Sequence, residues 1–389
     1  KSIIICIDKK IKYKFDVDYS RCEFIDVIDT CSIFSNLLKL VFITLFVGVF
    51  SQIFGTNNSL TWVCVLIGTM MYWYMDIGIN IKQAPFVIVL MFLQIGFSNK
   101  LAQINPVIGL IVNFITIFLI MYIPSAKPEY KAYMPFLLCY IFNQSNPAEG
   151  HDFVTRMLSL LIGGVIVSLV YYFKNKNSNK EHDTIKQAFK SMSITSNRFI
   201  IALKMAIGVS IAMLIGTLFG VKKTMWISMS VMSLTQIDFS NTQKRFISRI
   251  ISTIIGSIVF AILFQALVPE KYDVIVTIIL NYIYTFINDY KYQVIFITVN
   301  AISSASALFD TSTAIELRIL LIIFGCVLGY IINKINFRKY FTLLKRKFRR
   351  MGKLGTHNLS YENGAIKLIK DIEVDVSVSE IQGSLIVDS

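Results

Sequence analysis

Apolar stretches and short polar intervals alternate along most of the chain. About twelve apolar segments follow one another, and with their flanks several approach the roughly 20 residues that a helix needs to cross a bilayer. This succession predicts an all-α polytopic membrane protein with about twelve transmembrane helices. The segments are residues 36–55, 60–75, 84–98, 105–123, 132–143, 154–173, 199–219, 225–236, 246–268, 273–288, 292–308 and 317–335.

The two halves of the chain resemble each other. The sequence KLVFITLFVGVFSQIFG that begins at Lys39 aligns with KMAIGVSIAMLIGTLFG, which begins at Lys204. Six crossings in each half would give both halves the same orientation, so the pattern predicts two parallel six-helix repeats. The later landmarks of the repeat are the pairs Trp62 and Trp226, Asp76 and Asp238, and Arg156 and Arg318.

The alignment and the polar intervals divide the chain into five parts. Polar residues between the two repeats form a linker, and alternating apolar and charged residues near both ends predict small cytoplasmic termini with some β-structure, including strands at 1–18 and 372–381 and a turn at 362–364. The predicted parts are an N-terminal segment (1–34), a first membrane repeat (35–173), the linker (174–197), a second membrane repeat (198–336), and a basic juxtamembrane helix with a tail (337–389).

Charge fits a membrane protein better than a nucleic-acid-binding protein. Only 16% of the residues are charged, against about 25% in soluble domains, and the formal net charge is +14. Most lysines and arginines flank apolar segments on one side, which predicts that both termini are cytoplasmic; Lys222 and Lys223 are the exception. The basic segment 337–353 is expected to contact anionic lipid, with a regulatory role as an alternative.

Residues typical of cofactor or metal sites are scattered. The six cysteines include no C-x-x-C pair, the three histidines have no ligand spacing, and no nucleotide-binding motif is present. We therefore expect no metal, no cofactor and no enzymatic activity.

One helix has a face of small, polar and cationic residues. These residues recur at spacings of three, four and seven, and an arginine facing lipid at mid-membrane costs about 2.5–3.5 kcal/mol on insertion scales. The face is therefore expected to line the protein interior or a water-filled cavity as an entrance for an anion. Lys244 and Arg245 also suit a purely topological role, which explains Arg249 less well. The residues of this face are Thr242, Arg245, Arg249, Ser252, Thr253 and Gly256.

Two lysines and a tryptophan are further candidates. Lys39 and Lys204 open the leading helix of each half, where they could extend to the membrane surface or face the conduit. Trp226 could hold an aromatic ring.

The paired aspartates and arginines allow several roles. Asp76 and Asp238 could cap a helix, pair with an arginine or carry a coupling proton. Arg156 and Arg318 open the sixth helix of each half, near the opposite face. They could be buried and paired, for Arg318 with Glu316 or Asp310, or extend to the headgroups.

The second half resembles the fusaric acid resistance family, which includes the bacterial aromatic acid exporters and is distantly related to the plant aluminium-activated malate transporters. The chain departs from the family pattern at Thr235–Ile237, where a proline is usual, and at Ser252, where a glycine is usual; the first half fits only as a degraded copy. The pattern W-x3-S…D-F-x2-T-x2-R-x3-R-x3-T-x2-G that carries the resemblance is formed by Trp226, Ser230, Asp238, Phe239, Thr242, Arg245, Arg249, Thr253 and Gly256.

This resemblance implies an inner-membrane exporter of aromatic or other organic carboxylates, driven by ion gradients, with a conduit between the two halves. Arg249, Arg245 and Lys204 are the preferred anion contacts, with Trp226, Thr253 and Lys39 as further conduit residues. A passive anion channel and a non-transporting scaffold or accessory protein remain as alternatives. The protein could also form a homo-oligomer or act with an accessory protein.

Overall fold

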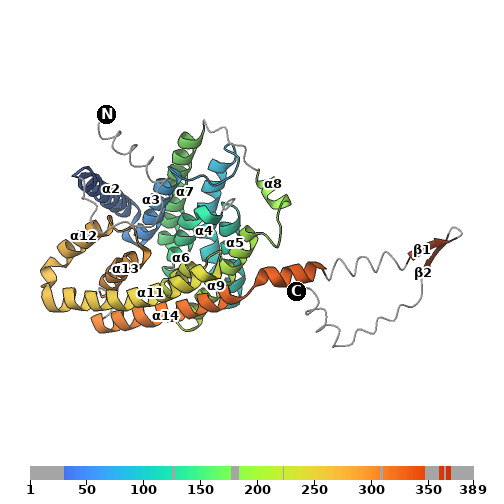
Figure 1. Ribbon diagram of the computed structural model, residues 1–389. Coiled ribbons are helices and arrows are strands. Elements are labelled where there is room, and N and C mark those ends of the chain that lie inside the picture. The colour runs from blue at the N-terminus through green and yellow to red at the C-terminus, as the bar shows by residue number, and fades with distance from the viewer. Residues whose placement is uncertain are drawn as a thin grey trace. The chain divides into compact units, whose positions relative to one another are not determined.

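The computed structural model describes residues 30–124, 128–176, 184–221, 223–306, 310–346, 359–362 and 365–368. Contacts divide the chain into two compact units, Lys1–Ile335 and Asn336–Ser389. The regular elements described in the first unit are helices, joined by turns and irregular segments (Figure 1).

Each of the twelve predicted apolar segments contains a helix. In the first half these are α2 (Thr30–Phe54), α3 (Ser59–Tyr72), α4 (Ala84–Ala102), α5 (Pro106–Tyr122), α6 (Met134–Ser145) and α7 (Gly150–Asn175). The short helix α8 (Ile185–Lys190) follows. In the second half they are α9 (Asn197–Leu218), α10 (Met225–Leu234), α11 (Phe239–Ala261) with a π-helical extension (Ile262–Leu267), α12 (Asp273–Tyr284), α13 (Tyr290–Ser306) and α14 (Thr311–Lys334).

Six helical stretches of the described chain are long and apolar enough to cross a membrane. This makes the protein an α-helical, multi-pass membrane protein, while the remaining helices are shorter, among them α5, α10 and α12. The prediction of twelve crossings therefore stays a prediction. The six stretches are Ile33–Phe54, Ala84–Ala102, Gly150–Asn175, Asn197–Leu218, Phe239–Leu267 and Thr311–Arg346.

Local sequence signals set several helix starts. Asn105 precedes α5, and its side-chain oxygen accepts a hydrogen bond from the Val107 backbone N–H at 2.8 Å. Pro106 then occupies the first turn, where its missing N–H costs nothing. Thr184 and Gln187 form a reciprocal capping box at α8, so even this short helix has a defined start.

Glycines allow the sixth helix of each half to pack closely on the second. A Cβ atom on Gly163 of α7 would lie 2.3 Å from a methyl group of Val65 on α3. A Cβ atom on Gly325 of α14 would lie 2.6 Å from the carbonyl oxygen of Ile227 on α10. Both distances are shorter than van der Waals contact, so these helix pairs approach more closely than a larger residue would allow.

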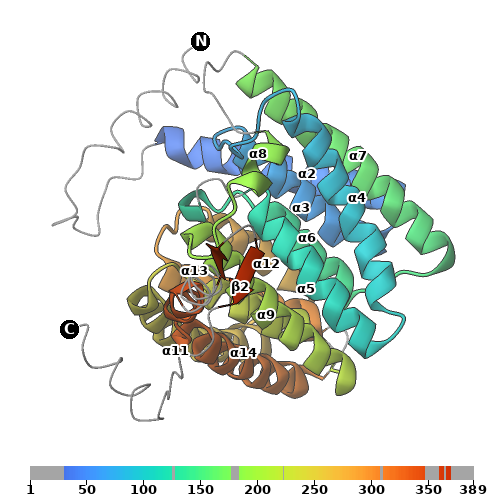
Figure 2. The same ribbon diagram turned by 90° about the vertical axis from the view of Figure 1, so that its right-hand side faces the viewer.

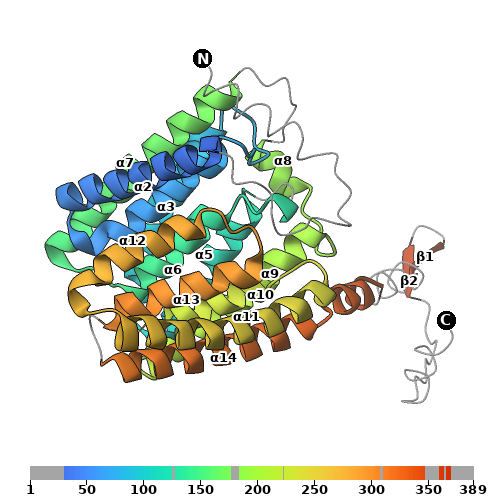
Figure 3. The ribbon, with the colours of Figure 1, turned by 60° about the vertical axis from the view of Figure 1, so that its left-hand side comes forward.

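Several helix pairs join the two halves, among them α6 with α10, and two of these pairs correspond to each other. The fourth helix of the first half, α5, lies along the first helix of the second half, α9 (Figure 2). Reciprocally, α12 contacts α2 (Figure 3). The long helices of the two halves differ in direction: in Figure 1, α4 and α7 run up the view and α11 and α14 run across it. A two-fold axis relating the halves would therefore have to bisect these directions.

The second unit contains a short β-hairpin. Strand β1 (Leu359–Glu362) pairs antiparallel with β2 (Ala365–Leu368), with Leu359 opposite Leu368. Residues 337–346 of the predicted basic segment are helical. The strands predicted at 1–18 and 372–381 lie outside the described residues, as does the rest of the basic segment.

Candidate functional site

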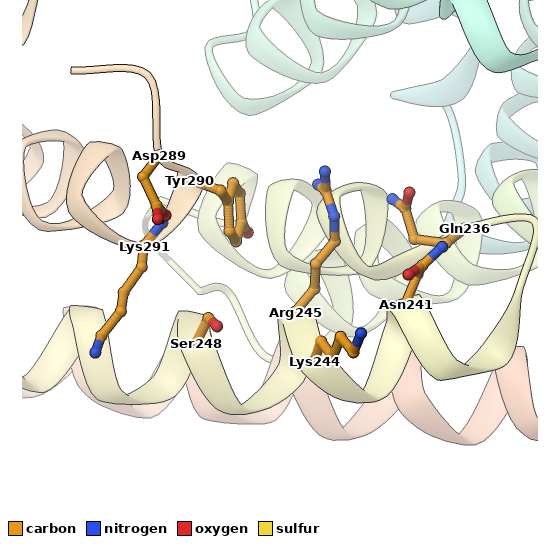
Figure 4. Close-up of a pocket in the computed structure, with 8 residues that line it drawn as sticks. All are labelled: Gln236, Asn241, Lys244, Arg245, Ser248, Asp289, Tyr290 and Lys291. Carbon is orange, nitrogen blue, oxygen red and sulfur yellow. The ribbon is translucent and has the colours of Figure 1, made fainter. Parts of the chain in front are cut away.

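A pocket of about 390 Å³ opens between α11 and the start of α13. Helix α11 supplies one wall, and the residues around the start of α13 supply the other (Figure 4). Three cationic side chains and one carboxylate line it, so the pocket carries a net positive charge. Its lining residues are Gln236, Asn241, Lys244, Arg245, Ser248, Asp289, Tyr290 and Lys291.

Arg245 is held against the aromatic wall of this pocket. Its guanidinium lies 4.5 Å from the centroid of the Tyr290 ring, and its Nη1 donates to the backbone oxygen of Ser233 at 3.3 Å. The side chain is half-buried, whereas Lys244 and Lys291 are exposed. A guanidinium stacked on an aromatic face keeps its edge donors available for a ligand.

Arg249 lies one turn further along α11 and is connected to the pocket through Tyr290. It is only 5% exposed, and its Nη1 donates to the Tyr290 hydroxyl at 3.2 Å. Its Nε donates to the hydroxyl of Ser230 on α10 at 3.3 Å. Both acceptors are neutral, and none of the side chains described as buried is an aspartate or a glutamate. The charge of Arg249 is therefore solvated by hydroxyl groups without a carboxylate beside it.

The small residues of the same face serve mainly the packing of α11. Thr253 is buried, and its hydroxyl donates to the Arg249 backbone oxygen at 2.8 Å. A Cβ atom on Gly256 would lie 2.8 Å from the Ile295 backbone oxygen of α13. The close contact at Gly256 brings α11 near α13, which is the helix that carries Tyr290.

Trp226 and Arg318 lie together in the interior of the second half. The guanidinium of Arg318 is 4.9 Å from the centroid of the Trp226 ring, and both residues are fully buried. Arg318 lies close enough to Arg249 for their charges to repel each other. Glu316 and Asp310, the partners considered from the sequence, are exposed.

Arg156 has a different environment from its counterpart Arg318. Its Nε donates to Asn58 Oδ1 at 3.0 Å, and its Nη2 donates to the Asn57 backbone oxygen at 3.2 Å. Its Nη1 donates to the Asn146 backbone oxygen. Arg156 therefore ties the segment between α2 and α3 to the segment between α6 and α7.

The two candidate lysines lie outside the pocket. Lys204 is half-buried, and its Nζ donates to the Asn333 backbone oxygen at the end of α14 at 2.9 Å. Lys39 is exposed, and its Nζ donates to Asn36 Oδ1 on the same helix at 3.2 Å.

The two aspartates are not equivalent. Asp76 Oδ1 accepts hydrogen bonds from the Gly78 backbone N–H and from the Tyr171 hydroxyl, both at 2.8 Å. Asp238 is exposed at the start of α11, and its side chain makes no capping hydrogen bond. Neither residue lines the pocket.

The structure adds residues that the sequence did not single out. Asp289, Tyr290 and Lys291 line the pocket. In the sequence, the only indication of such a role is their place in a polar interval between two apolar segments. Lys131, which precedes α6 in the first half, is half-buried with a positive φ of 53°. Burial, and then the nearby charge of Arg245, lower its pKa. A cation from the first half thus lies near the pocket of the second.

The fold and the pocket define a multi-pass membrane protein with a cationic pocket in its second half. Residues 211–332 match the family model described as fusaric acid resistance protein-like, so the resemblance found in the sequence is confirmed for this part of the chain. The match runs from within α9 to within α14 and therefore contains α11 and the pocket. Together with the apolar helices, this match supports a membrane transport-related protein. No curated protein and no solved structure matches the chain.

Proposed function

We propose that the protein is an exporter of aromatic or other organic carboxylates in the bacterial inner membrane. The observation that carries the proposal is the connection from the cationic pocket, through the Tyr290 hydroxyl, to the buried Arg249. A carboxylate attracted by Lys244, Arg245 and Lys291 can form paired hydrogen bonds with a guanidinium. Arg249 provides the next guanidinium inward.

The proposed conduit lies between two parallel six-helix repeats, each crossing the membrane six times. Equivalent glycine contacts support the repeat: Gly163 packs on Val65 and Gly325 on Ile227, and both positions differ by 162 between the halves. Arg156 and Arg318 differ by the same number. The reciprocal contacts of α5 with α9 and of α12 with α2 also suit a two-fold relation. In this topology both termini are cytoplasmic, and the basic segment 337–353 contacts anionic lipid.

Lys131 supports a role for both halves in anion handling. It comes from the first half, yet its charge interacts with Arg245 in the pocket wall of the second. An anion between these two cations would relieve their repulsion. Lys204 and Lys39 are less direct candidates, since their ammonium groups bond to Asn333 and Asn36.

The proposal is tested by flux from liposomes that contain the purified full chain. Benzoate is a suitable aromatic carboxylate, and benzyl alcohol is its uncharged counterpart. We expect benzoate flux that Arg249→Ala and Arg245→Ala each reduce by about tenfold or more, because each loses a charge-assisted hydrogen bond. Lys190→Ala on α8 is the control, since this exposed lysine lies away from the pocket.

The same liposomes distinguish the other classes of function. Flux that follows the voltage and ignores an imposed proton gradient would indicate a passive anion channel in place of an exporter. If the well-folded wild type carried no flux while deletion of residues 355–389 abolished function in cells, the protein would be a scaffold or an accessory protein. Unchanged flux and charge selectivity in both arginine variants would contradict the proposed role of the pocket.

A further inference from the structure

Arg318 is a buried cation with an unused hydrogen-bond donor. It is 2% exposed, and its Nε has no hydrogen-bond partner. Its described contact is the face of the Trp226 ring at 4.9 Å. An aromatic face stabilises a cation but accepts none of the in-plane N–H bonds, so the donors of the guanidinium edge remain available.

The surroundings increase the need for an anion at this position. Arg249 is also buried and lies within reach of the charge of Arg318. Two buried positive charges near each other are unfavourable without a counter-charge. None of the side chains described as buried carries a carboxylate that could supply it.

The corresponding residue of the first half shows how the chain satisfies such an arginine when no ligand is needed. Arg156 has its Nε and both terminal nitrogens bonded to oxygens of Asn57, Asn58 and Asn146. Arg318 has a sequence position equivalent to that of Arg156, but it has an aromatic ring where Arg156 has three oxygen acceptors. The first half therefore supplies acceptors for its arginine from its own polar groups, whereas the second half leaves the Nε of Arg318 without an acceptor.

We propose that Arg318 is the inner anion-binding residue of the second half and takes the carboxylate of an organic anion, with Arg249 between it and the pocket. The carboxylate oxygens would accept from the free guanidinium edge, as the asparagine oxygens do at Arg156. Trp226 would hold the plane of the guanidinium fixed, so that little side-chain freedom is lost on binding. The route from the pocket rests on the proposed function, whereas the binding site itself does not.

The test measures the binding of benzoate to the purified chain in detergent, by calorimetry and by tryptophan fluorescence. Arg318→Met keeps an unbranched side chain over Trp226 and removes the donors, and Arg318→Lys keeps the charge and removes the paired geometry. We expect Arg318→Met to weaken benzoate binding by about tenfold or more and Arg318→Lys to weaken it less. Lys334→Met is the control, because this exposed lysine is on the same helix.

A second readout separates anion binding from a role in folding. If Arg318 binds an anion, benzoate should raise the melting temperature of the wild type and of Lys334→Met, and should raise that of Arg318→Met much less. Trp226→Phe should remove the fluorescence change that benzoate produces. Benzyl alcohol should reproduce none of these effects.

The outcomes for the binding site and for the proposed function are distinct. Unchanged benzoate affinity in a folded Arg318→Met protein overturns the inference; if Arg249→Ala then still weakens binding, the anion stops at Arg249. If Arg318→Met folds too poorly to measure, Arg318→Lys provides the test. Benzoate affinity equal to that of the wild type in Arg318→Lys, together with no change in Trp226 fluorescence, would also overturn the inference. Loss of binding in Arg318→Met combined with absent flux in the wild type supports the inference and refutes the transporter.

Discussion

The hydroxyl of Tyr290 lies 3.2 Å from Nη1 of Arg249. This hydrogen bond joins a residue that lines the pocket to a buried residue of α11. Because Arg245 stacks on the ring of the same tyrosine, Tyr290 orients both arginines: one through its face and the other through its hydroxyl.

Removing this hydroxyl separates the two roles. Tyr290→Phe keeps the ring under Arg245 and deletes the acceptor for Arg249, so a hydrogen bond to a charged group, worth roughly 1.5–3 kcal/mol, is lost. We expect benzoate flux to fall by about tenfold and the melting temperature to fall with the lost hydrogen bond, while the ring contact with Arg245 is kept. Tyr74→Phe, at an exposed position after α3, should leave flux unchanged. Full activity in Tyr290→Phe would show that the hydroxyl does not orient Arg249 for transport.

Replacing Arg156 should affect folding more than ligand binding. Arg156→Met leaves the buried Oδ1 of Asn58 without its donor, and an unsatisfied buried acceptor costs about 1–3 kcal/mol. The Asn57 backbone oxygen keeps the donor Nδ2 of Asn146. We expect a clearly lower melting temperature, measured by thermal unfolding in detergent.

Arg318→Met is the matched comparison for this variant. Exchanging a buried, poorly compensated charge for an apolar side chain is often neutral or stabilising, so its melting temperature without ligand should equal or exceed that of the wild type. Equal destabilisation of the two variants would contradict the different roles assigned to the two arginines.

The contact of α14 with α10 depends on Gly325. In Gly325→Ala the new methyl group would meet the Ile227 carbonyl oxygen at 2.6 Å and the Ser230 Cβ at 2.8 Å, so the helices must separate. We expect a loss of about 1–3 kcal/mol in the free energy of unfolding. Gly48→Ala in α2 is the control, because a Cβ atom there has no neighbour within 4 Å. Equal stability of both variants would mean that α10 and α14 tolerate a wider spacing.

Lys131 should make anion binding depend on pH in the alkaline range. Burial and the charge of Arg245 lower its pKa, so it loses its charge below the ordinary lysine value of about 10.4. Benzoate binding should weaken as the pH rises through this lowered pKa. Calorimetric titrations over this range should show a flatter pH dependence for Lys131→Gln than for the wild type and for Lys186→Gln, an exposed control on α8. The same pH dependence in Lys131→Gln would exclude Lys131 as its source.

The effect of Lys131 on folding has the opposite direction. A lysine with a lowered pKa in the folded state binds fewer protons there than in the unfolded chain. The free energy of unfolding contributed by this residue should therefore increase as the pH rises from the lowered pKa towards the ordinary value.

The sequence was sufficient to locate the helices and the family, but not the contacts of the site. The helical period and the apolar content can be read from residues that are close together in the sequence. The segment around Arg249 could therefore be assigned to a helix with one polar face. The pocket depends on α11 meeting the start of α13, a long-range contact that Tyr290 and Lys291 do not reveal from their position in the chain. Their place in a short polar interval was equally consistent with a solvated loop.

Side-chain partners were predicted less well than burial. Nearby Glu316 and Asp310 were reasonable partners for Arg318, yet both are exposed, and Arg318 stacks on Trp226 from another helix. Sequence proximity favours partners on the same helix, whereas a buried side chain also meets residues of the helices packed against it. The equivalence of Lys39 and Lys204 in the alignment likewise did not extend to their environments.

The oxygens around Arg156 also have an evolutionary consequence. If the two halves descend from one duplicated ancestor, the copy that satisfies its arginine internally has become the fixed framework, and the other copy is free to adapt to new ligands. Inherited changes near Asn57 and Asn58 would then be removed by selection because they reduce the amount of folded protein. Changes around Trp226 would persist as differences in what related proteins carry.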